Sequence, residues 1–271
     1  MARTSGKVLF LIDFFSAIYY FFVISLSLYS SDFLMTWVCG KVSGYWSIFY
    51  WIIFCTFSFL FLVFYISLIY SSLPRLKEGF SQMPNHPTVL LWVIKFYIKK
   101  PLTLPLIHHV LHSFHTLTYV VYKLMGMNIS YGFQMSSNVD IRDPELFVFG
   151  KDSTIGGDVI ITGHFMIREN LVLKKVVLAN NVMIGAGAKI LNGVKIGAHT
   201  AIGHGCEISH DVSIGTNCIL GAKTVLGTNV VIGNRVRTKE GTFILKGSVI
   251  ADESYIEGIF DNSVDYKNKI Q

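Results

Sequence analysis

The chain has 271 residues, of which 52% are hydrophobic and 14% aromatic, and it carries a formal net charge of +6. This composition is too apolar for a single soluble domain, and the apolar excess lies at the N-terminal end. Lys and Arg are spread along the chain without matching a nucleic-acid-binding module, so a nucleic-acid partner is not expected. The four cysteines do not indicate a disulfide framework and fit a reducing compartment.

Two long apolar segments lie near the N-terminus, from about Val8 to Tyr29 and from about Tyr45 to Tyr70. Each is long enough to cross the hydrocarbon core of a bilayer, and Asp13 is their only formal charge. The sequence therefore predicts a transmembrane hairpin in residues 1–72. A cleaved signal peptide is the alternative for the first segment, but this segment is long for one and has no clear cleavage site.

Basic residues flank this hairpin on one side only. Arg3 and Lys7 precede the first segment, whereas the loop between the segments carries a single basic residue, Lys41. Five more basic residues follow the second segment: Arg75, Lys77, Lys95, Lys99 and Lys100. Positive charge is retained on the cytoplasmic side, so we expect an integral membrane protein whose termini and C-terminal domain both face the cytoplasm.

Residues 73–130 form a connector that several prolines divide into short pieces. Two amphipathic helices are predicted in it, Thr88–Lys100 and Leu106–Leu124, both too polar to span a bilayer and suited to lie at its surface. His108, His112 and His115 share one face of the second helix. This cluster is interpreted as neutral or headgroup-facing histidines, with a metal site as the alternative.

A large aliphatic residue recurs at every sixth position of the C-terminal half: Leu178, Ile184, Ile190, Ile196, Ile202, Ile208, Ile214, Leu220, Leu226 and Ile232. A small or β-branched residue follows each of them by four positions, and Gly directly follows most of them. Six residues make one short strand and one corner, and three such units close a coil of about eighteen residues. The pattern predicts stacked coils with parallel strands over residues 131–250, followed by a tail of residues 251–271.

The same period is present upstream at Phe149, Ile155 and Ile161. The step from Ile161 to Leu178 is seventeen residues, which breaks the six-residue register. We therefore predict an excursion or an irregular coil over residues 164–175. Cys206 and Cys218 occupy the small inward position of the repeat, where Cys acts as a compact apolar side chain.

This repeat resembles the hexapeptide-repeat acyltransferase superfamily, and the segment Gly157–His164 is similar to the maltose and galactoside acetyltransferase branch. The resemblance implies a left-handed parallel β-helix and a homotrimer. The same resemblance implies that acyl-CoA, with acetyl-CoA as the first choice, is a co-substrate bound between neighbouring subunits without a metal. It also implies that one histidine is the general base. His164 is the first candidate for it, because it follows Gly163 where the regular coil breaks.

His204 is the second candidate for the base. The segment Ile202–Ile208 is similar to the His-x-Cys stretch of the acyltransferases of lipid A synthesis and of the sialic acid O-acetyltransferase branch. Two positions depart from that pattern, because Gly205 replaces an expected Asp and Ser213 replaces a second His. Asp140 and Asp143 are the candidates for a carboxylate that partners the base.

The resemblance places Gly203, Gly221 and Lys223 at the border of the CoA tunnel. These glycines are also corner residues of the repeat, which gives them a structural explanation. A Gly-x-Pro-Ala-Lys signature, which usually follows the last coil in this superfamily, is absent from the sequence. Its absence weakens the transfer of CoA-binding details to this chain.

Two other functions remain open. His164, His199 and His204 are spaced by 35 and 5 residues, which is similar to the three zinc ligands of γ-class carbonic anhydrases, enzymes that divide these ligands between subunits. A catalytically inactive trimeric scaffold is the other alternative. The preferred interpretation is a CoA-dependent O-acetyltransferase that acts on a glycan or lipid-linked acceptor at the cytoplasmic membrane surface.

Overall fold

The computed structural model describes residues 6–40, 47–83 and 86–262. It divides into two compact units, one reaching to Pro74 and including Leu91–Leu104, the other containing Arg75–Leu90 and the chain from Pro105 onward. Arg3, Lys41, Tyr45 and residues 263–271 of the predicted tail lie outside the described residues.

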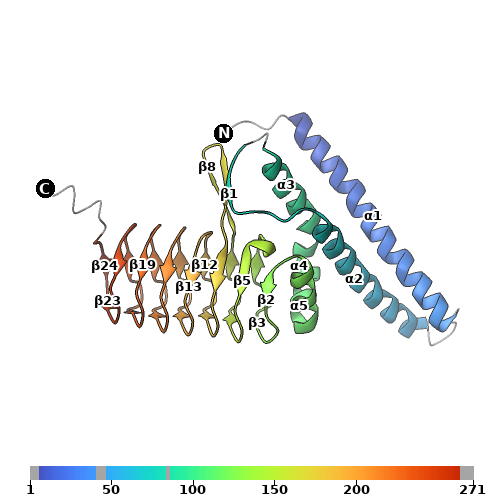
Figure 1. The fold of residues 1–271 in the computed structure, drawn as a ribbon. Helices are drawn as coiled ribbons and strands as arrows, with labels where there is room; N and C mark the ends of the chain where they lie inside the picture. Colours follow the sequence, from blue (N-terminus) through green and yellow to red (C-terminus); the bar gives the residue numbers. More distant parts are fainter. Residues whose placement is uncertain (1–5, 41–46, 84–85, 263–271) are drawn as a thin grey trace. The chain divides into compact units, whose positions relative to one another are not determined.

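The first unit is built on two long helices, α1 (Gly6–Cys39) and α2 (Ser47–Ser72), which pack along each other (Figure 1). Both are apolar because their sequences contain almost no charged residue. They include stretches of 25 residues each, Phe14–Val38 and Ile48–Ser72, that are long and apolar enough to cross a membrane. The prediction of two apolar helices is thereby confirmed, and their membrane insertion stays a prediction.

The C-terminal part of α3 (Pro87–Lys99) and the short helix η2 (Lys100–Thr103) also belong to the first unit. The Tyr20 hydroxyl donates to the carbonyl of Tyr97 over 3.1 Å. The ammonium of Lys95 is buried and lies 4.3 Å from the centre of the Tyr70 ring. The structure thus divides the predicted connector, because the first of its helices lies mainly with α1 and α2.

The second unit is a three-sided parallel β-solenoid whose short strands form three sheets of seven strands each. Sheet 1 contains β2 (Asn128–Ile129), β5 (Phe147–Phe149), β10 (Val176–Leu178), β13 (Lys195–Ile196), β16 (Ser213–Ile214), β19 (Val231–Ile232) and β22 (Val249–Ile250). Sheet 2 contains β3 (Gln134–Met135), β6 (Thr154–Ile155), β11 (Met183–Ile184), β14 (Ala201–Ile202), β17 (Ile219–Leu220), β20 (Arg237–Thr238) and β23 (Tyr255–Ile256). Sheet 3 contains β4 (Asp140–Ile141), β7 (Ile160–Ile161), β12 (Lys189–Ile190), β15 (Glu207–Ile208), β18 (Val225–Leu226), β21 (Phe243–Ile244) and β24 (Ile259–Phe260).

The repeat explains this architecture directly. Ile196 pairs with Ile214, one coil of eighteen residues later, and both side chains are buried in the core. Cys206 and Cys218 are also fully buried, as their repeat positions predict, and burial raises the pKa of both thiols. The prediction of a parallel β-helix is therefore confirmed. The strands begin at Asn128 and continue to Phe260, ten residues beyond the end at 250 that the repeat predicts.

Glycine follows the inward aliphatic residue because consecutive coils approach too closely for a side chain. A Cβ on Gly203 would lie 2.6 Å from the backbone nitrogen of Ala222 in the next coil, which is well inside van der Waals contact. A Cβ on Gly221 would meet the nitrogen of Glu240 at the same distance. Coil spacing, and not an unusual backbone angle, thus explains these two glycines.

The edge where sheet 3 passes to sheet 1, named edge 3–1 below, is irregular in two successive coils. The short helix η3 (Pro144–Leu146) lies at this edge in the first coil, where Ile129 pairs with Phe149 across twenty residues instead of eighteen. In the next coil a hairpin of β8 (His164–Ile167) and β9 (Asn170–Leu173) interrupts the coil and projects from it (Figure 1). This hairpin is the predicted excursion before Leu178.

A third strand joins this hairpin from far away in the sequence. Strand β1 (Gly79–Gln82) pairs antiparallel with β9, so that Phe80 lies opposite Val172 and Gly79 opposite Leu173. Glu78 also forms an ion pair of 3.2 Å with Lys175 at the base of the hairpin. The segment that follows α2 therefore completes a three-stranded sheet, which the sequence did not predict.

The helix predicted over Leu106–Leu124 is instead two helices, α4 (Pro105–Ser113) and α5 (His115–Leu124). Phe114 separates them because its backbone is extended. Tyr122 of α5 belongs to the solenoid core, so α5 covers the end of the first coil. The face of α5 that carries Tyr119 and Tyr122 thus packs on the solenoid core and closes its end, whereas the sequence pattern predicts a membrane surface for this helix.

His112 is a buried part of this cap. Its Nδ1 atom donates to the carbonyl of His108 over 2.8 Å, and its Nε2 atom accepts from the Tyr122 hydroxyl over 2.9 Å. Burial, together with the neighbouring His108, lowers the pKa of His112 to about 4. A neutral His112 is therefore expected at physiological pH, whereas His115, which the sequence pattern places on the same helical face, lies on the separate helix α5.

Candidate active site

His164 and Asp143 lie side by side at edge 3–1. The Nδ1 atom of His164 is 2.6 Å from Oδ2 of Asp143, and the carboxylate is buried whereas the imidazole keeps 16% of its side-chain surface exposed. His164 begins β8 and Asp143 immediately precedes η3, so the two irregular coils supply one residue each. The structure therefore brings together two of the residues selected from the sequence.

The backbone around this pair holds it in place. The N–H of Gly163 donates to the same Oδ2 atom of Asp143 over 2.9 Å, and the Thr162 hydroxyl lies 3.2 Å from His164 Nδ1. A Cβ on Gly163 would lie 2.7 Å from Cβ of Leu146 in η3. Glycine is thus required here, because it lets the start of the hairpin approach the coil that carries Asp143.

This geometry prepares His164 to accept a proton. A carboxylate only accepts hydrogen bonds when ionised, so Asp143 assigns the imidazole proton to Nδ1. The basic lone pair is then on Nε2, the arrangement that a general base requires. The carboxylate also stabilises the positive charge that the ring gains when it takes a proton.

Asp140, the other predicted carboxylate partner, is directed elsewhere. It forms an ion pair of 3.0 Å with Arg142, and both side chains are largely exposed. The two aspartates are three residues apart in the sequence, yet only Asp143 lies beside a histidine. The extended backbone of β4 places Asp140 outward, whereas the turn into η3 directs Asp143 inward.

A second histidine at the same edge was not selected from the sequence. The ring of His210 lies 3.9 Å from the ring of Phe165, the residue after His164, and His210 Nδ1 is hydrogen-bonded to Oδ1 of the buried Asn192. Burial is the main cause that lowers the pKa of His210, and Lys174 adds to it. The eighteen-residue spacing between Asn192 and His210 was the signal that could have identified this pair.

The other predicted site residues lie at a different edge. His204, Gly203, Gly221 and Lys223 are at the corners between sheets 2 and 3. His204 is exposed, and no carboxylate pairs with it among the residues that the structure describes. Lys223 has a left-handed backbone, with φ of 57°, and its N–H donates to the carbonyl of His204 over 2.7 Å. These residues form a corner of the solenoid that is separate from the pair of His164 and Asp143.

The three histidines of the zinc hypothesis are at three different edges of one chain. His164 is at edge 3–1, His199 follows β13 at the edge between sheets 1 and 2, and His204 is at the edge between sheets 2 and 3. Within residues 6–40, 47–83 and 86–262, no group of three or more His, Cys, Asp or Glu side chains is arranged to hold a metal ion. A single chain therefore does not bring these ligands together.

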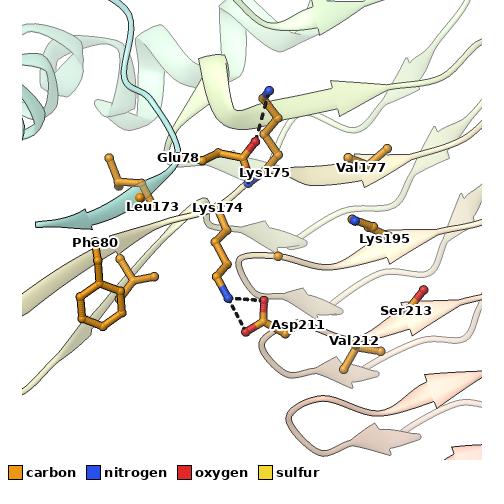
Figure 2. Close-up of a pocket in the computed structure, with 13 residues that line it drawn as sticks. Glu78, Phe80, Leu173, Lys174, Lys175, Val177, Lys195, Asp211, Val212 and Ser213 are labelled. Carbon is orange, nitrogen blue, oxygen red and sulfur yellow. Dashed lines mark hydrogen bonds and ion pairs between the residues drawn. The ribbon is translucent and has the colours of Figure 1, made fainter.

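A cleft of about 630 Å³ lies between sheet 1 and the sheet formed by β1 and the hairpin. Val172–Lys175 line one side, and Val177, Lys195 and Ser213 line the other. Figure 2 shows two ion pairs in it, Lys174 with Asp211 and Lys175 with Glu78. Leu173, which lines the cleft, is the strand partner of His164, so the cleft and the pair share one hairpin.

Residues 175–210 and 193–228 match the family model described as bacterial transferase hexapeptide (six repeats). No curated protein matches the chain. The matched residues lie wholly within the regular part of the solenoid, after the hairpin that carries His164.

Several solved structures are similar to this chain over part of its length. A Bacillus cereus protein described provisionally as an acetyltransferase is 15% identical, with a TM-score of 0.39 and coverage of 46% of this chain and 69% of that chain. The acetyltransferase domain of PglB from Neisseria gonorrhoeae, in complex with acetyl coenzyme A, is 15% identical, with a TM-score of 0.31 and coverage of 53% and 58%. A perosamine N-acetyltransferase mutant from Caulobacter crescentus, in complex with CoA and GDP-perosamine, is 15% identical, with a TM-score of 0.28 and coverage of 54% and 60%. The chain thus spans less than two thirds of the last two proteins.

Proposed function

We propose that this protein is a hexapeptide-repeat acyltransferase that transfers an acyl group, in the first place acetyl, from acyl-CoA to a hydroxyl group. The family match within residues 175–228 and the parallel solenoid support this proposal. The acceptor is a glycan or a lipid-linked molecule at the cytoplasmic surface of a membrane. The observation that carries the proposal is the hydrogen bond of 2.6 Å between His164 and the buried Asp143 at edge 3–1.

The reaction needs little from the protein because a thioester is already activated. His164 Nε2 takes the proton of the acceptor hydroxyl, and the oxygen forms a bond to the thioester carbonyl carbon. The carbon–sulfur bond breaks, and the proton held by His164 passes to the leaving sulfur, which gives an ester and free CoA. Asp143 keeps Nδ1 protonated throughout and stabilises the charged ring.

The two apolar helices support this choice of acceptor class. Two helices that can cross a membrane precede the solenoid, and a soluble sugar acceptor would not require such an anchor. The basic residues that flank these helices favour a cytoplasmic solenoid, the side on which acyl-CoA is available. Membrane insertion and orientation are therefore parts of the same proposal.

A homotrimer is also part of the proposal. The outer face of sheet 2 carries Met183, Ala201 and Ile219 one above another, and the side chains of Met183 and Ile219 are exposed. A flat face with exposed apolar residues is suited to burial against a second copy of the chain. Light scattering of the purified protein in detergent tests the stoichiometry, and a monodisperse monomer would contradict this part.

The activity is tested by incubating the purified full-length protein with a panel of acyl-CoA donors and a membrane lipid extract. Release of the CoA thiol and a matching increase in the mass of one extract component are the expected results. A parallel incubation with soluble sugars identifies the acceptor class. Absence of thiol release with every donor and acceptor would contradict an acyltransferase.

The orientation is tested separately with topology reporters in cells. A reporter fused after Gln271 and one inserted at Lys41 are expected to report opposite sides of the membrane, with Gln271 on the cytoplasmic side. Acyl-CoA is too polar to cross a bilayer unaided. An external C-terminal reporter would therefore exclude a CoA donor.

A further inference from the structure

The cleft beside the hairpin contains one cation that the local carboxylates do not neutralise. Three lysines line it, Lys174, Lys175 and Lys195, against two carboxylates. Asp211 accepts two hydrogen bonds from Lys174, of 2.6 and 2.7 Å, and Glu78 lies 3.2 Å from Lys175. Among the residues that the structure describes, no carboxylate pairs with Lys195.

Lys195 is directed into a polar part of the cleft. It is the strand partner of Ser213 in the next coil of sheet 1, and both residues line the cleft (Figure 2). An ammonium beside a hydroxyl offers several hydrogen-bond donors to one anion. Phosphate is the common biological anion that lysine binds as a point charge.

The opposite wall, formed by β1 and the hairpin, carries a row of apolar side chains beside the paired lysines Lys174 and Lys175. Phe80 of β1, Val172 of β9 and Phe165 of β8 are consecutive partners across the three strands, so their side chains share one face of the small sheet. The Phe80 side chain is 65% exposed and lines the cleft. The other end of this row, Phe165, touches His210 beside the candidate active site.

A cleft that combines Lys195, which no carboxylate of the described residues neutralises, with an apolar row of side chains fits a ligand that joins a phosphate to a hydrocarbon chain. Two substrates have that chemistry here, the acyl-CoA donor and a lipid-linked acceptor. Strand β1, which supplies Phe80 to the apolar row, favours the second, because only six residues of chain separate Gly79 of β1 from Ser72, the last residue of the candidate span α2. The proposed acceptor is anchored in the same membrane as the proposed span α2, to which this short linker joins β1.

We propose that this cleft binds the phosphate of a lipid-linked acceptor, with Lys195 and Ser213 contacting the phosphate and Phe80 contacting the start of the lipid chain. The proposal rests on the acyltransferase function and specifies its acceptor as a polyprenyl or similar lipid phosphate. It also places the lipid phosphate end of the acceptor beside the hairpin that contains His164.

The test is a binding measurement that needs no turnover. Full-length protein in detergent is titrated with inorganic pyrophosphate and with farnesyl diphosphate, which adds a short isoprenoid chain. The expected result is tighter binding of farnesyl diphosphate. Lys195→Gln is expected to weaken the binding of both ligands about tenfold. Phe80→Ser is expected to weaken only the binding of farnesyl diphosphate.

Matched controls separate these effects from general surface changes. Lys189 precedes Ile190 in sheet 3 as Lys195 precedes Ile196 in sheet 1, so Lys189→Gln removes the same charge outside the cleft. Phe243→Ser removes an exposed phenylalanine side chain on sheet 3, outside the cleft. Neither control should change the binding of either ligand.

Two results would overturn the proposal. Unchanged binding in Lys195→Gln would show that the cleft does not hold the phosphate. Full competition between CoA and farnesyl diphosphate, with equal weakening of both by Lys195→Gln, would assign the cleft to the donor. Because acyl transfer is measured independently as thiol release, a failure of this proposal is distinguishable from a failure of the proposed function.

Discussion

Asp143 Oδ2 accepts two hydrogen bonds at once, one of 2.6 Å from the Nδ1 atom of His164 and one of 2.9 Å from the backbone N–H of Gly163. One buried oxygen thus holds both the side chain of His164 and the peptide that precedes it. Because this contact joins two successive coils at edge 3–1, the orientation of the imidazole depends on residues from η3 and from the hairpin.

The first prediction concerns the identity of the base. His164→Ala is expected to reduce kcat/KM for acyl transfer by about 10²- to 10⁴-fold, the usual contribution of a general base, while the protein remains folded. His204→Ala is the matched control, since His204 is exposed at another edge, and it should retain most of the activity. Retained activity in His164→Ala, with loss in His204→Ala or His210→Ala, would assign the base to another histidine.

The second prediction concerns Asp143 as a positioning residue. Asp143→Asn replaces an ionic acceptor by a neutral one, and a hydrogen bond to a charged group contributes about 1.5–3 kcal/mol. We expect kcat to fall about 10- to 100-fold and KM for acyl-CoA to stay nearly constant, because Asp143 acts through His164. Asp140→Asn is the control, since Asp140 pairs with Arg142. An increase in KM with unchanged kcat would indicate a binding role instead.

The third prediction concerns the close approach at Gly163. In Gly163→Ala the new Cβ would lie 2.7 Å from Leu146 Cβ, so the hairpin and η3 must separate. Overpacking of this kind costs about 1–3 kcal/mol, and the displacement should also lengthen the contact between His164 and Asp143. A lower melting temperature together with reduced kcat is expected.

Gly157→Ala provides the comparison for this change, because its Cβ would meet only the Ser136 side chain, at 3.3 Å. Thermal unfolding of the two variants in detergent, followed by fluorescence, measures the difference. Equal melting temperatures and equal activities would show that the contact between Gly163 and Leu146 is not needed.

The fourth prediction concerns the pH dependence of stability. Burial lowers the pKa of His112 to about 4 in the folded protein, whereas histidine in an unfolded chain has a pKa of about 6.5. Below about pH 6.5 the histidine binds a proton in the unfolded chain but not in the folded protein. It therefore destabilises the fold progressively as the pH falls toward 4. Between pH 7 and pH 5 this difference lowers the free energy of unfolding by about 2 kcal/mol.

Urea unfolding at pH 7 and pH 5 measures this effect in wild type, His112→Gln and His109→Gln. His112→Gln should be less stable at pH 7, because it loses the hydrogen bond with Tyr122, but its stability should depend less on pH than that of wild type. His109 is exposed, so His109→Gln should behave like wild type. An identical pH dependence in all three proteins would contradict a neutral buried His112.

The residues that define the solenoid could be read from the sequence because each of them meets the same requirement. Ile196 and Ile214 must both fill a narrow core, and Gly203 must let the next coil approach, so the period of six is visible without a structure. His164 and Asp143 could also be predicted as site residues from the sequence. His164 was identified from the resemblance to known acyltransferases, and Asp143 was one of two neighbouring aspartates that could partner it.

Tertiary structure alone decided which of these residues meet. The hairpin at edge 3–1 has no period, so its length, its pairing with β1 and its contact with His210 depend on residues far apart in the chain. Asp143 rather than Asp140 partners His164 because η3 turns the first one inward, and Lys195 faces a cleft only because β1 and the hairpin cover sheet 1. A repeated local requirement leaves a pattern in the sequence, whereas a single long-range contact occurs once and leaves none.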